Sequence, residues 1–144
     1  AFALFRLADA EFGVMSWLAN PREGYQLYRT GQGHWYALAI TSLSVRQPMA
    51  QLILSNTARA GATGFLKTLA LEVATDGVTV NSVQPGLHRT PRVTDLYSDE
   101  QQASLRMGDA ADFGQVVAFL CSEAAKFTSG VQLHVDGGSY LGLL

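Results

Sequence analysis

Residues 55–91 read SNTARAGATGFLKTLALEVATDGVTVNSVQPGLHRTP, and this stretch decides the fold. Its first part repeats apolar residues at steps of three and four, which is typical of a helix with one apolar face. Asp76-Gly77 is a turn signal, residues 78–83 suit a buried strand, and Pro85-Gly86 ends that strand. A helix, a turn, a buried strand and a glycine loop form half of an α/β unit, and open α/β sheets bind ligands at that end of their strands. The residues on the expected apolar helix face are Ala58, Ala62, Phe65, Leu66, Leu69 and Val73.

Composition predicts one globular domain over residues 1–144, because 48% of the residues are hydrophobic and 15% are charged. A net charge of −2 provides no basic field for nucleic acid or an anionic membrane. No apolar run approaches the roughly 20 residues that span a bilayer, and the first residues lack the pattern of a signal peptide. Cys121 is the only cysteine and cannot form an internal disulfide, so the expected location is the reducing cytoplasm. Its place in an apolar helical run predicts a buried thiol. The chain begins with alanine, which suggests a trimmed chain or a piece of a longer one.

The first 35 residues carry weaker signals. Residues 1–19 can form an amphipathic helix that ends at Asn20-Pro21. Residues 24–29 and 34–42 are two β-prone runs around a glycine-containing loop, which favours a hairpin. The alternative is that residues 23–29 are helical. The hairpin would give the strand at 37–42 an antiparallel neighbour.

Beyond the Pro85-Gly86 loop, residues 87–110 are polar and irregular. Ser98 is expected to cap a short helix over residues 99–107, with Gln101 in the capping-box position. Asp109 is the expected N-cap of a helix over residues 111–124, whose apolar face includes Phe113, Val116, Val117, Leu120 and Ala124.

The expected fold class is therefore α/β, a truncated Rossmann-like unit of three layers. Its mainly parallel sheet would contain strands 37–42, 78–83 and 131–136, with an antiparallel edge strand from the N-terminal hairpin. Helices 56–75 and 111–124 would be right-handed crossovers.

Several short motifs in the second part of the chain match a known pattern. The segments L-A-x-E, G-V-x-V-N-x-V-x-P-G and V-D-G-G lie at residues 69–72, 77–86 and 135–138, with Thr90 following the glycine loop. Over residues 37 to 139 the sequence resembles the C-terminal half of the short-chain dehydrogenases/reductases, in particular their 3-oxoacyl-acyl-carrier-protein-reductase-like members. The resemblance implies a cofactor, NAD or NADP, and a small-molecule carbonyl or alcohol substrate. It also implies a homo-oligomer formed through helix 56–75 and the last strand.

At two of the positions that are catalytic in the family, this sequence has different residues. The family's Tyr-x-x-x-Lys is replaced by Ser55-x-x-x-Arg59, and its glycine-rich dinucleotide fingerprint is absent. Ser42 lies at the family's spacing for the serine that steadies the substrate oxygen. Ser55 cannot replace the tyrosine simply, since a serine hydroxyl is shorter and titrates far above a phenol's pKa of about 10. Ser55 or Asn56 is instead the expected N-cap of the helix.

For several other candidate site residues, both a functional and a structural interpretation stay open. Arg59 either contacts cofactor ribose or phosphate, or is a solvent-facing or ion-paired arginine. Ser42 either steadies the substrate oxygen, as the resemblance implies, or satisfies a loop at the strand end. The resemblance implies that Pro85, Gly86 and Thr90 contact the cofactor; His88 is either a surrogate acid or base there, or a solvated loop residue. His34, His88 and His134 are too scattered for metal-ligand spacing, so no metal is expected.

Two functions follow from these observations. The first is an NAD(P)-dependent oxidoreductase of carbonyl or alcohol groups, incomplete and inactive as this isolated chain. The alternative is a catalytically dead relative that serves as a structural or oligomerisation module.

Overall fold

The computed structural model describes residues 27–29 and 34–143. Its main sheet has the strand order β1-β2-β3-β6. The strands are β1 (Leu27–Arg29), β2 (Trp35–Ile40), β3 (Val78–Pro85) and β6 (Gln132–Val135). β2, β3 and β6 are parallel and β1 is antiparallel to β2, as the sequence predicts.

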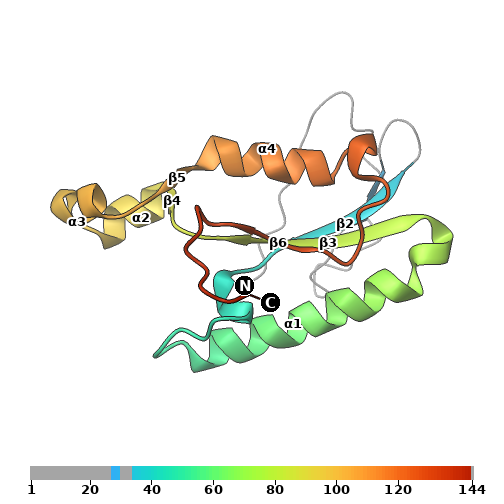
Figure 1. Ribbon diagram of the computed structural model, residues 1–144, viewed down its shortest axis with the longest axis horizontal. Helices are drawn as coiled ribbons and strands as arrows, with labels where there is room; N and C mark the ends of the chain where they lie inside the picture. The colour runs from blue at the N-terminus through green and yellow to red at the C-terminus, as the bar shows by residue number, and fades with distance from the viewer. Residues whose placement is uncertain (1–26, 30–33, 144) are drawn as a thin grey trace.

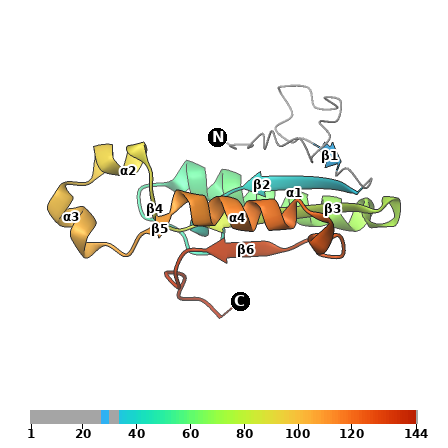
Figure 2. The same cartoon turned by 90° about the horizontal axis from the view of Figure 1, so that it is seen from above.

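One long helix covers each face of this sheet (Figure 1). Helix α1 (Ile53–Glu72) lies on one side and α4 (Ala110–Leu120) on the other, so the predicted three layers are confirmed. Figure 2 shows α4 lying over the strands from above. Side chains alternate between the two layers, as they do in any strand. Ala37, Ala39 and Val80 pack against α1, while Tyr36 and Val83 pack towards α4.

The sequence-predicted hairpin is present where the structure describes it. Leu27 pairs with Ala37 and Arg29 with Trp35. The connecting residues 30–33 and the expected helix over residues 1–19 lie outside the described residues.

Helix α1 begins three residues earlier than expected, which makes the cap prediction wrong. Its N-cap is Leu52, without a side-chain cap, so Ser55 and Asn56 already lie inside the first turn. The side chain of Asn56 instead forms hydrogen bonds with both backbone groups of Met49. Its Nδ2 donates to the Met49 carbonyl at 2.9 Å, and its Oδ1 accepts from the Met49 N–H at 3.4 Å. This pairing holds the preceding loop against the helix start.

The apolar face of α1 is narrower than its periodicity suggests. Leu66 and Ala70 are buried, but Phe65 is 53% exposed and Ala58 is also exposed. Similarly, α4 ends at Leu120, and Ala124 lies exposed in the following 3-10 turn η3 (Glu123–Ala125), where Ala125 is the buried residue.

Residues 87–109 leave the sheet as one excursion (Figures 1 and 2). Two short parallel strands, β4 (His88–Arg89) and β5 (Gly108–Asp109), close its base. It contains α2 (Pro91–Leu96), which the sequence analysis missed, and α3 (Asp99–Ser104). The predicted capping box between Ser98 and Gln101 is present. Pro91 in the first turn of α2 is the signal that could have revealed it.

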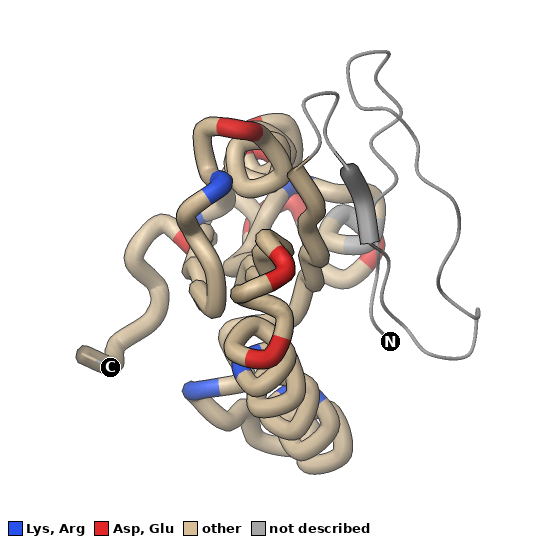
Figure 3. Tube along the Cα trace, turned by 90° about the vertical axis from the view of Figure 1, so that its right-hand side faces the viewer, with Lys and Arg blue, Asp and Glu red and all other residues tan. Residues whose placement is uncertain are grey.

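Charged residues are dispersed over the described part of the chain (Figure 3). No helix in that part is both long and apolar enough to span a membrane. Cys121 is buried as expected; burial raises the pKa of its thiol to about 12, against the opposing effect of a hydrogen bond with Tyr36.

Candidate functional site

The carboxyl ends of the parallel strands meet at one edge of the sheet, and most candidate residues lie there. Ser42 follows β2, Pro85 and Gly86 end β3, and Asp136 follows β6. Helix α1 returns across the sheet between two parallel strands, so its first turns lie at this same edge. The topology therefore brings Ser42, Ser55, Arg59 and Gly86 to one end of the molecule.

Ser42 serves the loop that follows its strand. Its Oγ accepts a hydrogen bond from the backbone N–H of Ser44 at 3.2 Å and caps the 3-10 turn η1 (Leu43–Val45). This bond uses the oxygen as an acceptor and leaves the hydroxyl proton available as a donor. The loop interpretation is thus supported, and it is compatible with a substrate contact.

Arg59 reaches from α1 to the end of β2. Its Nη1 donates to the carbonyl oxygen of Thr41 at 3.4 Å, in the peptide unit shared with Ser42. The contact holds a guanidinium beside the serine at the edge of the sheet. Because Arg59 is half-buried and the guanidinium has five donors, this one bond leaves donors for a further ligand.

Gly86 has a packing requirement of its own. Its N–H donates to the Val135 carbonyl at 3.0 Å, continuing the pairing of β3 with β6. A Cβ at this position would lie 2.6 Å from the Cα of Asp136. The absence of a Cβ at Gly86 is therefore needed for the chain after β6 to lie this close to the end of β3, whatever else the loop binds.

His88 connects three parts of the structure. Its Nδ1 lies 3.2 Å from the carbonyl oxygen of Gly86, and its ring packs edge-on against Phe113 of α4 with centroids 5.2 Å apart. A Cβ on Gly108 would lie 2.9 Å from the same ring. The half-buried ring therefore packs against α4 and β5 and does not extend freely into solvent.

Thr90 occupies the N-cap position of α2, just beyond β4. It is half-buried and separates the Gly86 loop from the helical excursion. The predicted cofactor residues Pro85, Gly86, His88 and Thr90 thus form one continuous segment that leaves the sheet edge.

Gln84 and His134 are two further polar residues at this edge that the sequence motifs did not indicate. They are register partners on β6 and β3, and Gln84 is fully buried. Burial and the nearby Arg46 lower the pKa of His134, while Asp136 opposes that shift. A single glutamine within a β-prone run does not indicate from sequence alone that Gln84 is buried. Among residues 27–29 and 34–143, no three His, Cys, Asp or Glu side chains gather to hold a metal ion.

Asp136→Asn is expected to lower the melting temperature at neutral pH and to have little effect well below pH 4. The carboxylate accepts backbone N–H bonds from Gly138 at 2.9 Å and Tyr140 at 2.7 Å. Burial raises its pKa, but these bonds and His134 outweigh burial and lower the pKa overall. The stabilisation is therefore present above the unfolded pKa of about 3.9 and disappears as pH falls through the folded value. Thermal unfolding between pH 2.5 and 7 measures this difference, and an equal loss at every pH would contradict it.

Comparisons with known proteins agree with this arrangement. A family model described as enoyl-(acyl carrier protein) reductase matches residues 21–140. The chain is 46% identical over 91 residues to the 3-oxoacyl-(acyl-carrier-protein) reductase FabG of Haemophilus influenzae, an alignment that covers 58% of this chain and 37% of the relative. The chain belongs to the short-chain dehydrogenase/reductase family.

Solved structures give the same result. A short-chain type dehydrogenase/reductase from Mycobacterium ulcerans is 28% identical, with a TM-score of 0.66 over 72% of this chain and 41% of that one. A 4-hydroxyisoleucine dehydrogenase complexed with NADH is 25% identical, with a TM-score of 0.65 over 73% and 46% of the two chains. The chain thus spans less than half the length of these relatives.

Proposed function

We propose that this chain carries the nicotinamide side of the active site of an NAD(P)-dependent oxidoreductase for small carbonyl or alcohol substrates. The observation that carries the proposal is the bond from Arg59 to the Thr41 carbonyl, beside Ser42 and at the same edge as Gly86. The family resemblance assigns the substrate oxygen to Ser42 and the nicotinamide ribose to Arg59. A structural neighbour that is complexed with NADH supports a nicotinamide cofactor for this chain.

The bound cofactor would supply the hydride, and the chain's own residues would orient the reactants. The Ser42 hydroxyl can donate to the substrate oxygen, since its Oγ already accepts from Ser44. Arg59 provides a fixed positive charge for ribose hydroxyls or phosphate. Ser55 occupies the tyrosine position, but its hydroxyl titrates far too high to release a proton near neutral pH.

We therefore expect the purified 144-residue chain to show no dehydrogenase turnover. The glycine-rich fingerprint is absent from its sequence, and the tyrosine and lysine positions hold Ser55 and Arg59. We also propose that it works in the reducing cytoplasm, where the buried thiol of Cys121 would remain free. Oxidation of NADH or NADPH with any ketone by the pure chain would contradict the expected inactivity.

Arg59→Ala is expected to weaken cofactor binding roughly tenfold, the typical effect of losing one charge-assisted hydrogen bond. Titration of the chain with NADH and NADPH, followed by nicotinamide fluorescence and thermal shift, measures this. Lys126→Ala is the matched control, because Lys126 is an exposed cation next to η3, at the opposite end of α4 from the Gly86 loop. Unchanged binding by Arg59→Ala, or no saturable binding at millimolar cofactor, would contradict the proposal.

A second candidate function, a structural or oligomerising module, rests on the outer face of α1. At 100° per residue, Gly61 and Gly64 lie opposite the buried Leu66 and Ala70. A Cβ at either glycine would meet nothing within 4 Å. Four exposed apolar side chains flank them: Ile53, Leu54, Phe65 and Leu71. Glycines between apolar residues allow another backbone to approach closely, so we propose that a second copy binds this face.

Sedimentation velocity tests this second candidate. A Leu54→Glu/Phe65→Glu variant should be monomeric at concentrations where the wild-type chain is dimeric. Glu100→Gln/Glu123→Gln, which alters charge away from α1, should leave the dimer intact. A wild-type chain that is monomeric at all concentrations would exclude α1 as a self-association surface.

A further inference from the structure

Near the carboxyl ends of three neighbouring strands, polar side chains lie on the same face of the sheet. Ile40 pairs with Val83 and Thr41 N–H donates to the Val83 carbonyl at 2.9 Å, so Thr41 lies beside Gln84. Gln84 in turn pairs with His134. Because side chains alternate along a strand, this polar row shares the face of Ala39 and Val80, which α1 covers.

The polar row consists of groups that make no hydrogen bond. Thr41 Oγ1, both amide atoms of Gln84 and both ring nitrogens of His134 are buried without a partner among the residues that the structure describes. Gln84 is 0% exposed and Thr41 is 6% exposed. Ser44 and Thr63, the other described residues with such an atom, belong to η1 and α1, which pack together at this end of the molecule. The unsatisfied side chains thus gather in one region.

The surroundings of the polar row define its chemistry. At one end, Arg59 bonds the Thr41 carbonyl; at the other, the Tyr140 ring stacks on His134 with centroids 4.4 Å apart and planes 9° apart. Arg46 and Asp136 are charged groups that act on His134, and Asp136 is already held by two backbone N–H groups. The hydroxyl, amide and imidazole groups of the row are therefore neutral donors and acceptors, and the row itself contains no charged side chain.

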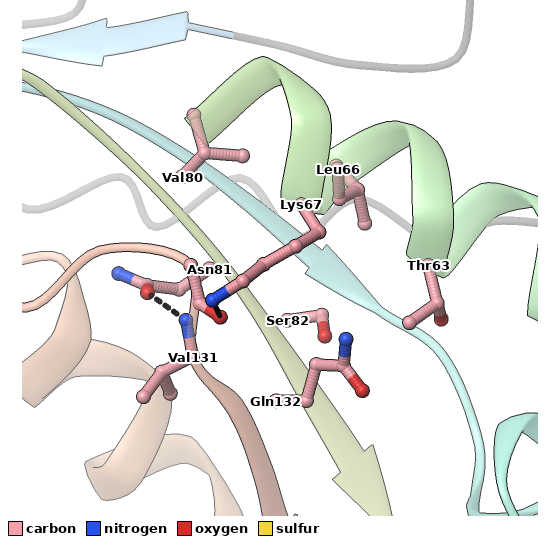
Figure 4. Close-up of a pocket in the computed structure, with 9 residues that line it drawn as sticks. Thr63, Leu66, Lys67, Val80, Asn81, Ser82, Val131 and Gln132 are labelled. Carbon is pink, nitrogen blue, oxygen red and sulfur yellow. Dashed lines mark hydrogen bonds between the residues drawn. The ribbon is translucent and has the colours of Figure 1, made fainter. Parts of the chain in front are cut away.

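A narrow crevice on the same face of the sheet is lined by Thr63, Ser82 and Gln132, among others (Figure 4). Ser82 and Gln132 lie one alternating step behind Gln84 and His134, with Thr63 on the helix beside them. Buried polar groups in native proteins are almost always paired with protein atoms or ordered water. Water donates and accepts two hydrogen bonds, which fits a hydroxyl, an amide and an imidazole better than an ion does.

We propose that the polar row of Thr41, Gln84 and His134 is an internal water-binding site beneath the start of α1. Bound water bridges the three side chains and links the peptide that Arg59 holds to the His134–Tyr140 pair. The half-buried His134 on the outer strand is the point of entry for solvent. The site does not depend on cofactor binding.

The melting temperature of Gln84→Met distinguishes a polar row that binds water from one whose side chains are unpaired. Methionine has a similar length and no polar head, so it should raise the melting temperature if the Gln84 amide is simply unpaired. If water bridges the row, Gln84→Met removes bonds and leaves Thr41 and His134 unsatisfied, and the melting temperature falls by about 2–5 °C. Gln115→Met, on the exposed side of α4, is the control and should change little.

NMR of the wild-type chain tests the site without a variant. We expect water cross-peaks with the side-chain amide protons of Gln84 and none with the Asn81 amide proton that bonds the Thr128 carbonyl. A melting temperature that is raised or unchanged in Gln84→Met would overturn the proposal. Absence of the Gln84 water cross-peaks would overturn it independently, even if the variant did not fold.

Discussion

Replacing Asn81 with alanine is expected to lower the free energy of unfolding by about 2–5 kcal/mol. Asn81 is 2% exposed, and its amide bonds two backbone groups of the turn before β6. Nδ2 donates to the Thr128 carbonyl at 2.7 Å, and Oδ1 accepts from the Val131 N–H at 3.0 Å. Alanine would remove both bonds and leave the Thr128 carbonyl and the Val131 N–H without these partners in a partly buried position.

The consequence of Asn81→Ala should reach the candidate site. The turn also contacts β3 through Ser129 Oγ, which accepts from Val80 N–H at 3.1 Å, and through Gly130 N–H, which donates to the Val80 carbonyl at 2.7 Å. Asn81 therefore sets the start of the β3–β6 pairing that ends at Gly86. Urea unfolding measures the loss. Asn56→Ala is the matched control, since its two bonds to Met49 are exposed and should contribute only about 1 kcal/mol. Equal losses in the two variants would contradict the role given to Asn81.

Gly86→Ala is the second large effect, with an expected loss of about 1–3 kcal/mol or more. The added Cβ would lie 2.6 Å from the Cα, 2.7 Å from the Cβ and 3.2 Å from the carbonyl oxygen of Asp136. These are largely backbone atoms of the adjacent chain, so relief requires β6 to move away from β3. The displacement would also alter the segment that we propose for the cofactor.

Gly114→Ala is the control for Gly86→Ala. Gly114 lies in α4 with nothing within 4 Å of an added Cβ, so alanine there should stabilise the helix by up to about 1 kcal/mol. Opposite signs for the two glycines are the expected result in urea unfolding. Wild-type stability of Gly86→Ala together with weaker cofactor binding would show instead that Gly86 serves the ligand alone.

Local sequence patterns predicted the elements of this fold well. The period of residues 58–73 indicated a helix, and the β-branched run after Asp76-Gly77 indicated the strand that became β3. Gly77 has a φ of 71°, which is the left-handed conformation that this turn signal implies. Such signals act between near neighbours, so no knowledge of the tertiary structure is needed to interpret them.

Tertiary contacts account for what the sequence could not show. The start of α1 depends on the pairing of Asn56 with Met49 across a loop, and the environment of His88 depends on Gly108 and Phe113, which are distant in sequence. The burial of Gln84 arises because three strands and a helix meet around it. The roles of Ser42, Ser55 and Arg59 in binding or catalysis remain predictions carried by the family resemblance.

The most direct test of the central claim is NMR mapping of NADH and NADPH on the isotope-labelled chain. We propose that the carboxyl edge of β2, β3 and β6 is one cofactor surface. The expected result is saturable shift changes at Ser42, Arg59, Gly86, His88 and Thr90, with little change at the opposite end of the sheet near Gly77 and Lys126. Changes confined to that opposite end, or no saturable change at millimolar cofactor, would contradict the account.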